Sequence, residues 1–370
     1  MSKFFLLLVL ATGAAQATPP DPLGSSTAEL AAAGERWTAQ VDDALRRRAE
    51  DPAARGGARN LLAAALVWPL PEADPGAGVL PEMAPEAKAW FAAAQAVRPS
   101  DPLVDSLEAV GCARMASDCD REAAVARLLE HDPGNAAVHL LAAQMASKRG
   151  DAVAARQHLH DAARARRYEA YDHKLLRLMI ESAADLDIPA PEPRLAQHLA
   201  TVFGSAQPIT ARDMVVTLAF GRAMALVAPG YAAVSTLCGV GEPVADQVHR
   251  QDCMDLLALM ARTEETLVTP YIALSLLSRH TAGEPEGDAW REQLRQTYWL
   301  QTQANPLMPG MPAAAMPLAD YAAVLLGQGE FEAMRALLRR NGQVPKAPAD
   351  WLPAHPHQRA LVTTGVPADR

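Results

Sequence analysis

The sequence predicts an all-α protein. Half of its residues are hydrophobic but only 5% are aromatic, and strands favour aromatic and β-branched residues whereas Ala and Leu favour helices. Apolar residues recur at three- and four-residue spacing along most of the chain, and no alternating strand pattern of useful length occurs. We therefore expect about fourteen to sixteen helices, arranged as helical hairpins.

The chain opens with a pattern typical of a secretory signal peptide. Lys3 precedes an apolar run that ends at Leu10, and Ala15-Gln16-Ala17 has the small residues of a cleavage site. The run is too short to cross a bilayer as a helix. We expect residues 1–17 to be removed, 18–25 to form a short N-terminal segment, and the mature protein to be periplasmic or extracellular, with no membrane span.

A helical region is predicted over residues 26–342. Ser26-Thr27-Ala28-Glu29 fits a capping box, so a first helix is expected to run to about Glu50 and a second to begin at Asp51-Pro52. The proline-rich stretch 69–85 is expected to be a loop. Three more stretches interrupt the helical period, namely 99–102, 187–193 and 305–317. The stretch 187–193 is the candidate break within the helical region.

The later elements follow the same period. Thr210 and Asp213 open a long apolar stretch, and Pro270 starts or kinks a helix. Trp290, Leu294 and Tyr298 recur at fourfold spacing and predict a buried stripe. The last predicted helices span 317–326 and 330–340. Residues 343–370 lack a period, so we expect a proline-rich tail that is disordered or lies on the surface.

The four cysteines are expected to form structural disulfides. Cys112 and Cys119 flank one break between helical patterns, and Cys238 and Cys253 flank another. Four cysteines allow three pairings, of which the simplest joins each close pair, and each bond would contribute about 2–3 kcal/mol. A zinc site or a thiol oxidoreductase is the alternative, but neither spacing matches the short forms that those sites use.

Residues 132–167 carry a more specific pattern. Two apolar helical faces flank a turn at Gly150-Asp151, and small or large residues alternate on the second helix. The residues of these faces are Val138, Leu141, Ala142, Ala143 and Met145, then Ala155, Leu159 and Ala162. This pattern resembles the tetratricopeptide repeat, a helix-turn-helix unit of about 34 residues. The preceding segment looks like the end of an earlier unit, so the resemblance covers about residues 101–167.

The resemblance implies a TPR-like α-solenoid whose concave surface binds peptides or partner proteins. The groove residues that it implies lie on the first helix and are His139, Gln144 and Lys148. Three positions depart from the family: His139 and Ala146 replace large aromatic residues, and Arg167 stands where a proline usually ends the unit. The expected function is a non-catalytic exported scaffold with a protein or peptide partner and no cofactor. The sequence does not distinguish such a scaffold from a structural subunit of a larger assembly.

Composition and motifs argue against several classes of function. A net charge of -9 argues against a nucleic-acid partner, and the common catalytic motifs are missing. The alternative is a cell-envelope hydrolase or glycan-cleaving enzyme, which needs two convergent carboxylates or a bound metal. One polar cluster is a candidate ligand or metal site. The simpler alternative is that its side chains form a solvated helix edge. Its members are His158, His160, Asp161, Tyr168, Asp172 and His173, although His158 and His160 lie about 200° apart on a helix.

Overall fold

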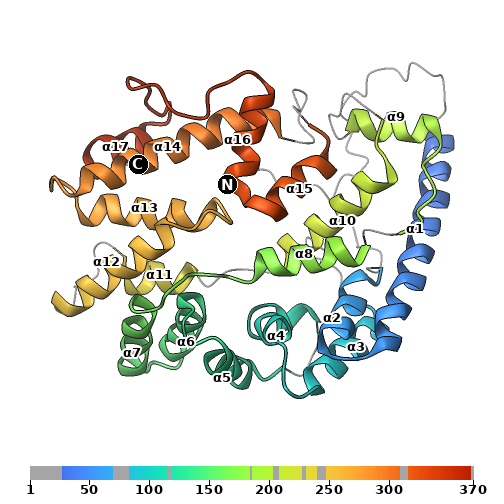
Figure 1. Cartoon of the computed structure of the whole chain (residues 1–370), viewed down its shortest axis with the longest axis horizontal. Helices are drawn as coiled ribbons and strands as arrows, with labels where there is room; N and C mark the ends of the chain where they lie inside the picture. Colours follow the sequence, from blue (N-terminus) through green and yellow to red (C-terminus); the bar gives the residue numbers. More distant parts are fainter. Residues whose placement is uncertain are drawn as a thin grey trace. The chain divides into compact units, whose positions relative to one another are not determined.

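The structure is a computed structural model that describes residues 27–69, 83–115, 119–183, 186–202, 208–226, 231–239, 247–308 and 316–367. These residues form seventeen α-helices, one short 3-10 helix and no strand, which confirms the all-α class for this part of the chain (Figure 1). The expected signal peptide and the segment 18–25 lie outside the described residues. Among the described helices, none combines the length and apolar character of a membrane span.

The chain divides into two compact units, each made of two separated segments. Unit 1 comprises residues 1–121 and 174–228, and unit 2 comprises 122–173 and 229–370. The interruption at 187–193 separates two helices inside unit 1, so the borders between the units fall elsewhere. Residues 174–228 follow closely after the repeat-like segment 132–167, yet they belong to unit 1, whereas that segment belongs to unit 2.

The helices of unit 1 pack in a connected series. Helix α1 packs on α2 and α9, α3 packs on α2 and α4, and α10 packs on α4. The bounds are α1 Thr27–Arg55, α2 Ala58–Val67, α3 Pro85–Ala96, α4 Pro102–Met115, α8 Asp172–Ala183, α9 Pro193–Val202 and α10 Ala211–Leu226.

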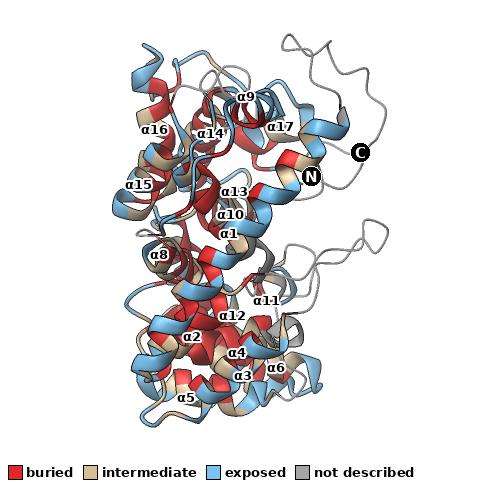
Figure 2. Ribbon diagram, turned by 90° about the vertical axis from the view of Figure 1, so that its right-hand side faces the viewer, coloured by how far each residue is buried: buried red, intermediate tan, exposed pale blue. Residues whose placement is uncertain are grey.

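The long helix α1 buries one stripe against α9 and α10. Buried and exposed residues alternate along its length in Figure 2, and the buried ones recur every four residues. Trp37 also donates a hydrogen bond from Nε1 to the Pro189 carbonyl at 2.8 Å, which ties the helix to the segment before α9. The stripe consists of Trp37, Val41, Leu45 and Ala49, and Leu195, Leu199, Met214 and Val215 share its core.

The first helix ends later than its prolines suggest. Helix α1 continues through Pro52 to Arg55, and α2 begins only at Ala58. The expected boundary at residues 50–51 is therefore wrong. Pro52 removes one hydrogen bond near the end of the helix, whereas Gly56 and Gly57 have φ values of 65° and 82°. This left-handed backbone is readily adopted by glycine, and it breaks the helix.

Unit 2 contains the remaining helices, seven of which share one hydrophobic core. That core takes residues from α6, α7, α11, α12, α13, α14 and α17. The bounds are α5 Arg121–His131, α6 Ala136–Lys148, α7 Ala152–Ala163, α11 Tyr231–Leu237, α12 Gln247–Ala261, α13 Val268–His280, α14 Gly287–Ala304, the 3-10 turn Asn305–Leu307, α15 Leu318–Gln328, α16 Glu330–Arg340 and α17 Pro356–Thr364.

Helices α6 and α7 form a close antiparallel hairpin. Asn135 caps α6 by accepting a hydrogen bond from the Ala137 amide, and Asp151 caps α7 by accepting one from the Ala154 amide. Small residues let the two helix backbones approach. The expected contact residues are all nearly inaccessible to solvent: Ala143, Ala155, Leu159 and Ala162.

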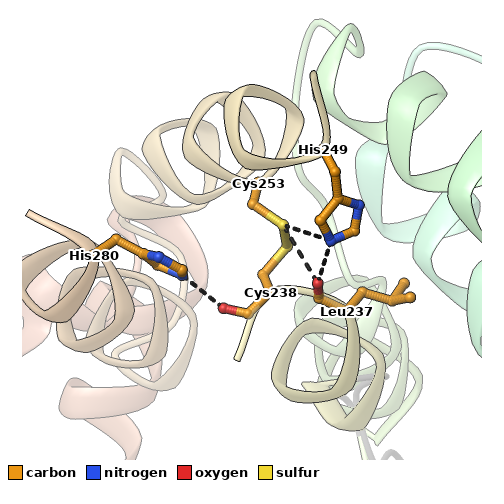
Figure 3. Close-up of a disulfide and its surroundings, with 5 residues drawn as sticks. All are labelled: Leu237, Cys238, His249, Cys253 and His280. Carbon is orange, nitrogen blue, oxygen red and sulfur yellow. Dashed lines mark hydrogen bonds between the residues drawn. A yellow bond between two sulfur atoms is a disulfide. The ribbon is translucent and has the colours of Figure 1, made fainter. Parts of the chain in front are cut away.

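Helices α11 and α12 pack on the first hairpin although 67 residues separate α7 from α11. Helix α11 packs on α6 and α12 packs on α7, and α12, α13 and α14 then follow one another in contact (Figure 1). Cys238 and Cys253 form a disulfide across the α11–α12 corner, with their Cα atoms 5.5 Å apart, so this pairing is confirmed (Figure 3). The side chain of Cys112 lies outside the described residues, and the Cys112–Cys119 pairing stays a prediction.

The C-terminal segment is not a tail over its described residues. Pro356 starts α17, and Gly365 closes it with a φ of 75°. Leu361 and Val362 are buried in the core of unit 2, where α17 packs on α13 and α14. Two apolar residues in a short helix give too weak a period to detect, which explains why the sequence pattern missed it.

Candidate functional site

Three potential metal ligands meet on the α6–α7 hairpin. His139 lies on α6, and His158 and Asp161 lie one turn apart on α7. One ligand atom from each side chain lies within 4.8 Å of the other two. The two imidazole centroids are 6.5 Å apart. The residues at 158 and 161 were expected in a polar cluster, whereas His139 was expected to line a partner groove.

His139 leaves one ring nitrogen without a hydrogen bond. The side chain is 9% exposed, and Nε2 donates to the Pro133 carbonyl at 2.9 Å. Because a carbonyl only accepts, Nδ1 of the neutral ring carries the lone pair. Among the described residues, neither this Nδ1 nor the buried Nδ1 of His158 has a partner, and such a group costs about 1–3 kcal/mol.

The surroundings favour the neutral form of His158. Burial is the largest effect that lowers the pKa of its imidazole below the usual value, and His139 and Arg149 lower it further. The carboxylates of Asp161 and Asp151 act in the opposite direction but do not reverse the shift. A neutral imidazole has a lone pair to offer to a metal ion or to a hydrogen-bond donor.

A buried aspartate fixes the chain on both sides of this hairpin. Asp132 accepts hydrogen bonds from Arg167 Nη2 at 2.8 and 2.7 Å, Tyr171 Oη at 2.7 Å and Asn135 Nδ2 at 3.0 Å. Burial raises the pKa of Asp132, but these hydrogen bonds and the charge of Arg167 outweigh it, so the pKa is lowered. The network joins the loop before α6 to the segment after α7, and Arg167 replaces the expected proline within it.

The rest of the expected polar cluster separates into two other places. His160 Nδ1 lies 2.9 Å from the Asp252 carboxylate on α12, which also lies 3.5 Å from Arg164. His173 donates from Nε2 to the Leu325 carbonyl at 2.9 Å. The six residues therefore do not form one site, because residues two positions apart lie on different sides of a helix.

Asp172 lies near a second buried carboxylate, Glu330. Burial raises the pKa of Asp172, and burial followed by the charge of Asp172 raises the pKa of Glu330. Glu330 Oε2 accepts a hydrogen bond from the Leu267 amide at 2.6 Å, at the start of α13. This bond satisfies an amide that the helix leaves unpaired, so Glu330 stabilises the start of α13.

Two histidines brace the disulfide corner. His249 donates from Nε2 to the Leu237 carbonyl at 2.8 Å, and His280 donates from Nε2 to the Cys238 carbonyl at 2.8 Å. Figure 3 shows both side chains on either side of the bond. Cys238 and Cys253 are each 2% exposed, so solvent thiols have little access to their sulfur atoms.

A groove of about 550 Å³ lies within unit 2. Helices α14 and α16, the end of α12 and residues 345–346 line it. Its acidic residues are paired: Glu264 lies 3.3 Å from Arg335, and Glu292 lies 2.7 Å from Arg295. Hydrogen bonding from Arg295 lowers the pKa of Glu292, and burial only partly opposes it.

Two cations of this groove remain available. Arg262 and Lys346 are exposed and form no ion pair with any residue that the structure describes, although the charge of Lys346 contributes to the lowered pKa of Glu292. The segment that carries Lys346 is held on α14, because Gln296 Oε1 accepts a hydrogen bond from the Ala347 amide at 2.9 Å. This groove could not be predicted from the sequence, since its lining residues are spread between positions 261 and 346 and only the fold brings them together.

The groove residues implied by the repeat resemblance are placed differently. His139 is buried inside the hairpin, Gln144 is half-buried and Lys148 is exposed. Only 9% of His139 is exposed, so it offers little surface to a partner. A groove role for Gln144 and Lys148 stays a prediction.

Comparison of the chain with protein-family models, with curated proteins and with solved structures finds no match. Any function must therefore be argued from the residues and the geometry described above.

Proposed function

We propose that this protein is an exported helical-repeat scaffold that binds a peptide or a flexible segment of a partner protein in the α12–α14–α16 groove. Export is supported by the signal-like start of the sequence and by the buried Cys238–Cys253 disulfide, because disulfides persist in oxidising compartments. The repeat character is supported by the successive packing of α6 on α7, α7 on α12, α12 on α13 and α13 on α14.

The observation that carries the binding proposal is the charge of the groove. The whole chain has a net charge of -9, yet the two groove cations without ion-pair partners are Arg262 and Lys346. Opposite charge on a ligand would be attracted to these two groups and would set its orientation. We therefore propose an acidic peptide as the ligand, with carboxylates near both cations.

The enzyme alternative gains no support from the same groove. A glycan-cleaving enzyme needs one carboxylic acid that donates a proton and a second carboxylate. Glu292 is held in its ionised form by Arg295, which makes it a poor proton donor. Asp172 and Glu330 have raised pKa values, but neither lines the groove. Binding is thus the function that the geometry favours.

Selection from a displayed peptide library tests the proposal. The mature chain should enrich peptides rich in Asp and Glu. The double variant Arg262→Glu/Lys346→Glu should bind them roughly 10-fold more weakly, because it replaces two attractive charge contacts of about 1 kcal/mol or less each by repulsive ones. Lys148→Glu is the matched control, since this exposed cation lies on α6. Equal loss in the control, or no acidic enrichment, would contradict the proposal.

A further inference from the structure

We propose that His139, His158 and Asp161 form a binding site for a divalent first-row transition-metal ion of the Zn²⁺ class. The proposal is independent of the peptide groove, because the three residues lie on the α6–α7 hairpin and none of them lines that groove. The site joins the two helices of one repeat-like unit.

The ligand types and spacing suit such an ion. Two imidazoles and one carboxylate are good ligands for zinc and its neighbours, whereas Mg²⁺ and Ca²⁺ prefer oxygen ligands. Zn²⁺ takes nitrogen and oxygen ligands at about 2.0–2.2 Å, so tetrahedral ligands lie roughly 3.4 Å apart. The ligand atoms already lie within 4.8 Å of one another, and small side-chain rotations close the difference.

The helices hold the ligands in place. His158 and Asp161 stand three residues apart on α7 and therefore project from the same side of the helix. His139 projects from α6, which packs closely on α7 through Ala143, Ala155 and Leu159. A metal ion here would need no rearrangement of the backbone.

The hydrogen bonds around the ligands point independently to a bound group. His139 is nine-tenths buried, yet its Nδ1 has no partner among the described residues, and the same holds for the buried Nδ1 of His158. The other ring nitrogen of His139 donates to the Pro133 carbonyl, and Gln157 Nε2 donates to Asp161 Oδ1 at 3.1 Å. Metal-ligating histidines and carboxylates are usually oriented by outer hydrogen bonds of this kind.

Other histidines are less suited to the ion. Among the described residues, only His139, His158 and Asp161 gather three potential ligand atoms within 4.8 Å of one another, and His160 on the same helix is engaged by Asp252. His355 and His357 lie near each other, with ring centroids 6.5 Å apart, so they are the competing place for adventitious binding. Any test has to separate this pair from the hairpin site.

The test measures Zn²⁺ affinity of the full chain by competition with a chromophoric chelator. We expect one tight equivalent in the wild type and in the double variant His355→Gln/His357→Gln, with affinities within threefold. His158→Gln and Asp161→Asn should each weaken binding by roughly 10- to 100-fold or more, since changes even to outer contacts have effects of that size. His160→Gln, on the same helix, is the matched control and should bind like the wild type.

A second readout separates the site from a folding effect. Zn²⁺ should raise the melting temperature of the wild type and of the His355→Gln/His357→Gln variant, because a ligand that binds only the folded state stabilises it. Asp161→Asn should retain its circular dichroism spectrum but lose this shift. Unchanged Zn²⁺ affinity in His158→Gln and Asp161→Asn would overturn the proposal. Loss of binding only in the His355→Gln/His357→Gln variant would also overturn it.

Discussion

Replacing Asp132 by alanine should destabilise unit 2 by about 2–4 kcal/mol. The change removes the carboxylate that accepts the hydrogen bond of the buried Tyr171 hydroxyl, and a hydrogen bond to a charged group contributes about 1.5–3 kcal/mol. It also removes the ion pair with Arg167, whose side chain is 46% exposed; solvent screening limits that contribution to about 1 kcal/mol. Asn135 keeps a second acceptor, the Glu169 carbonyl at 2.9 Å, so its amide adds little.

The assay is urea unfolding combined with hydrogen exchange of α6 and α7, since two units need not unfold in one step. The isosteric variant Asp132→Asn should lose less stability, because it keeps an acceptor oxygen. Glu122→Gln is the control: it removes an exposed pair with Arg149 and should change stability by about 0.5 kcal/mol or less. A loss in Asp132→Ala no larger than in this control would refute the reasoning.

The same aspartate predicts a pH dependence. Its folded pKa is below its unfolded value, so its contribution is fully present above the unfolded pKa of about 3.9 and disappears as pH falls through the folded pKa. The stability difference between wild type and Asp132→Asn should therefore be constant near neutral pH and shrink below about pH 4. A difference that grows on acidification would contradict the assigned direction.

Two further stability predictions follow from the packing of unit 2. The double variant Cys238→Ala/Cys253→Ala should lose about 3 kcal/mol, because the disulfide closes a loop with a sequence separation of 15; equal urea midpoints would contradict this. Leu361→Ala should lose about 2–4 kcal/mol by leaving a cavity under α17, since Leu361 is 4% exposed. Val366→Ala, at a 57% exposed position, is its control, and equal small losses in both variants would show that α17 does not contribute to the core.

Local features of the fold could be predicted from the sequence because they depend on neighbouring residues. The small residues of the α6–α7 contact and the Cys238–Cys253 pairing are examples. The stacking of α11 on α6 could not be predicted, since residues 149–230 lie between the two helices and no spacing pattern specifies which helix packs on which.

The candidate metal site was only half visible in the sequence. His158 and Asp161 are close in sequence, but proximity in sequence also gathered His160 and His173, which the helical period sends elsewhere. His139 was assigned to a groove from the repeat resemblance, yet its position on α6 turns it toward α7. A helix-to-helix contact of this kind depends on how the hairpin packs, which the period of one helix does not determine.

The most direct measurement of the binding proposal uses the four lysines that follow residue 17. A zero-length crosslinker that activates carboxylates would join an enriched acidic peptide to the nearest amine, and mass spectrometry would locate it. Lys88, Lys148, Lys174 and Lys346 are the candidates. Binding in the α12–α14–α16 groove predicts a crosslink to Lys346 that unlabelled peptide competes away. A competed crosslink to Lys148 instead, with none to Lys346, would contradict it.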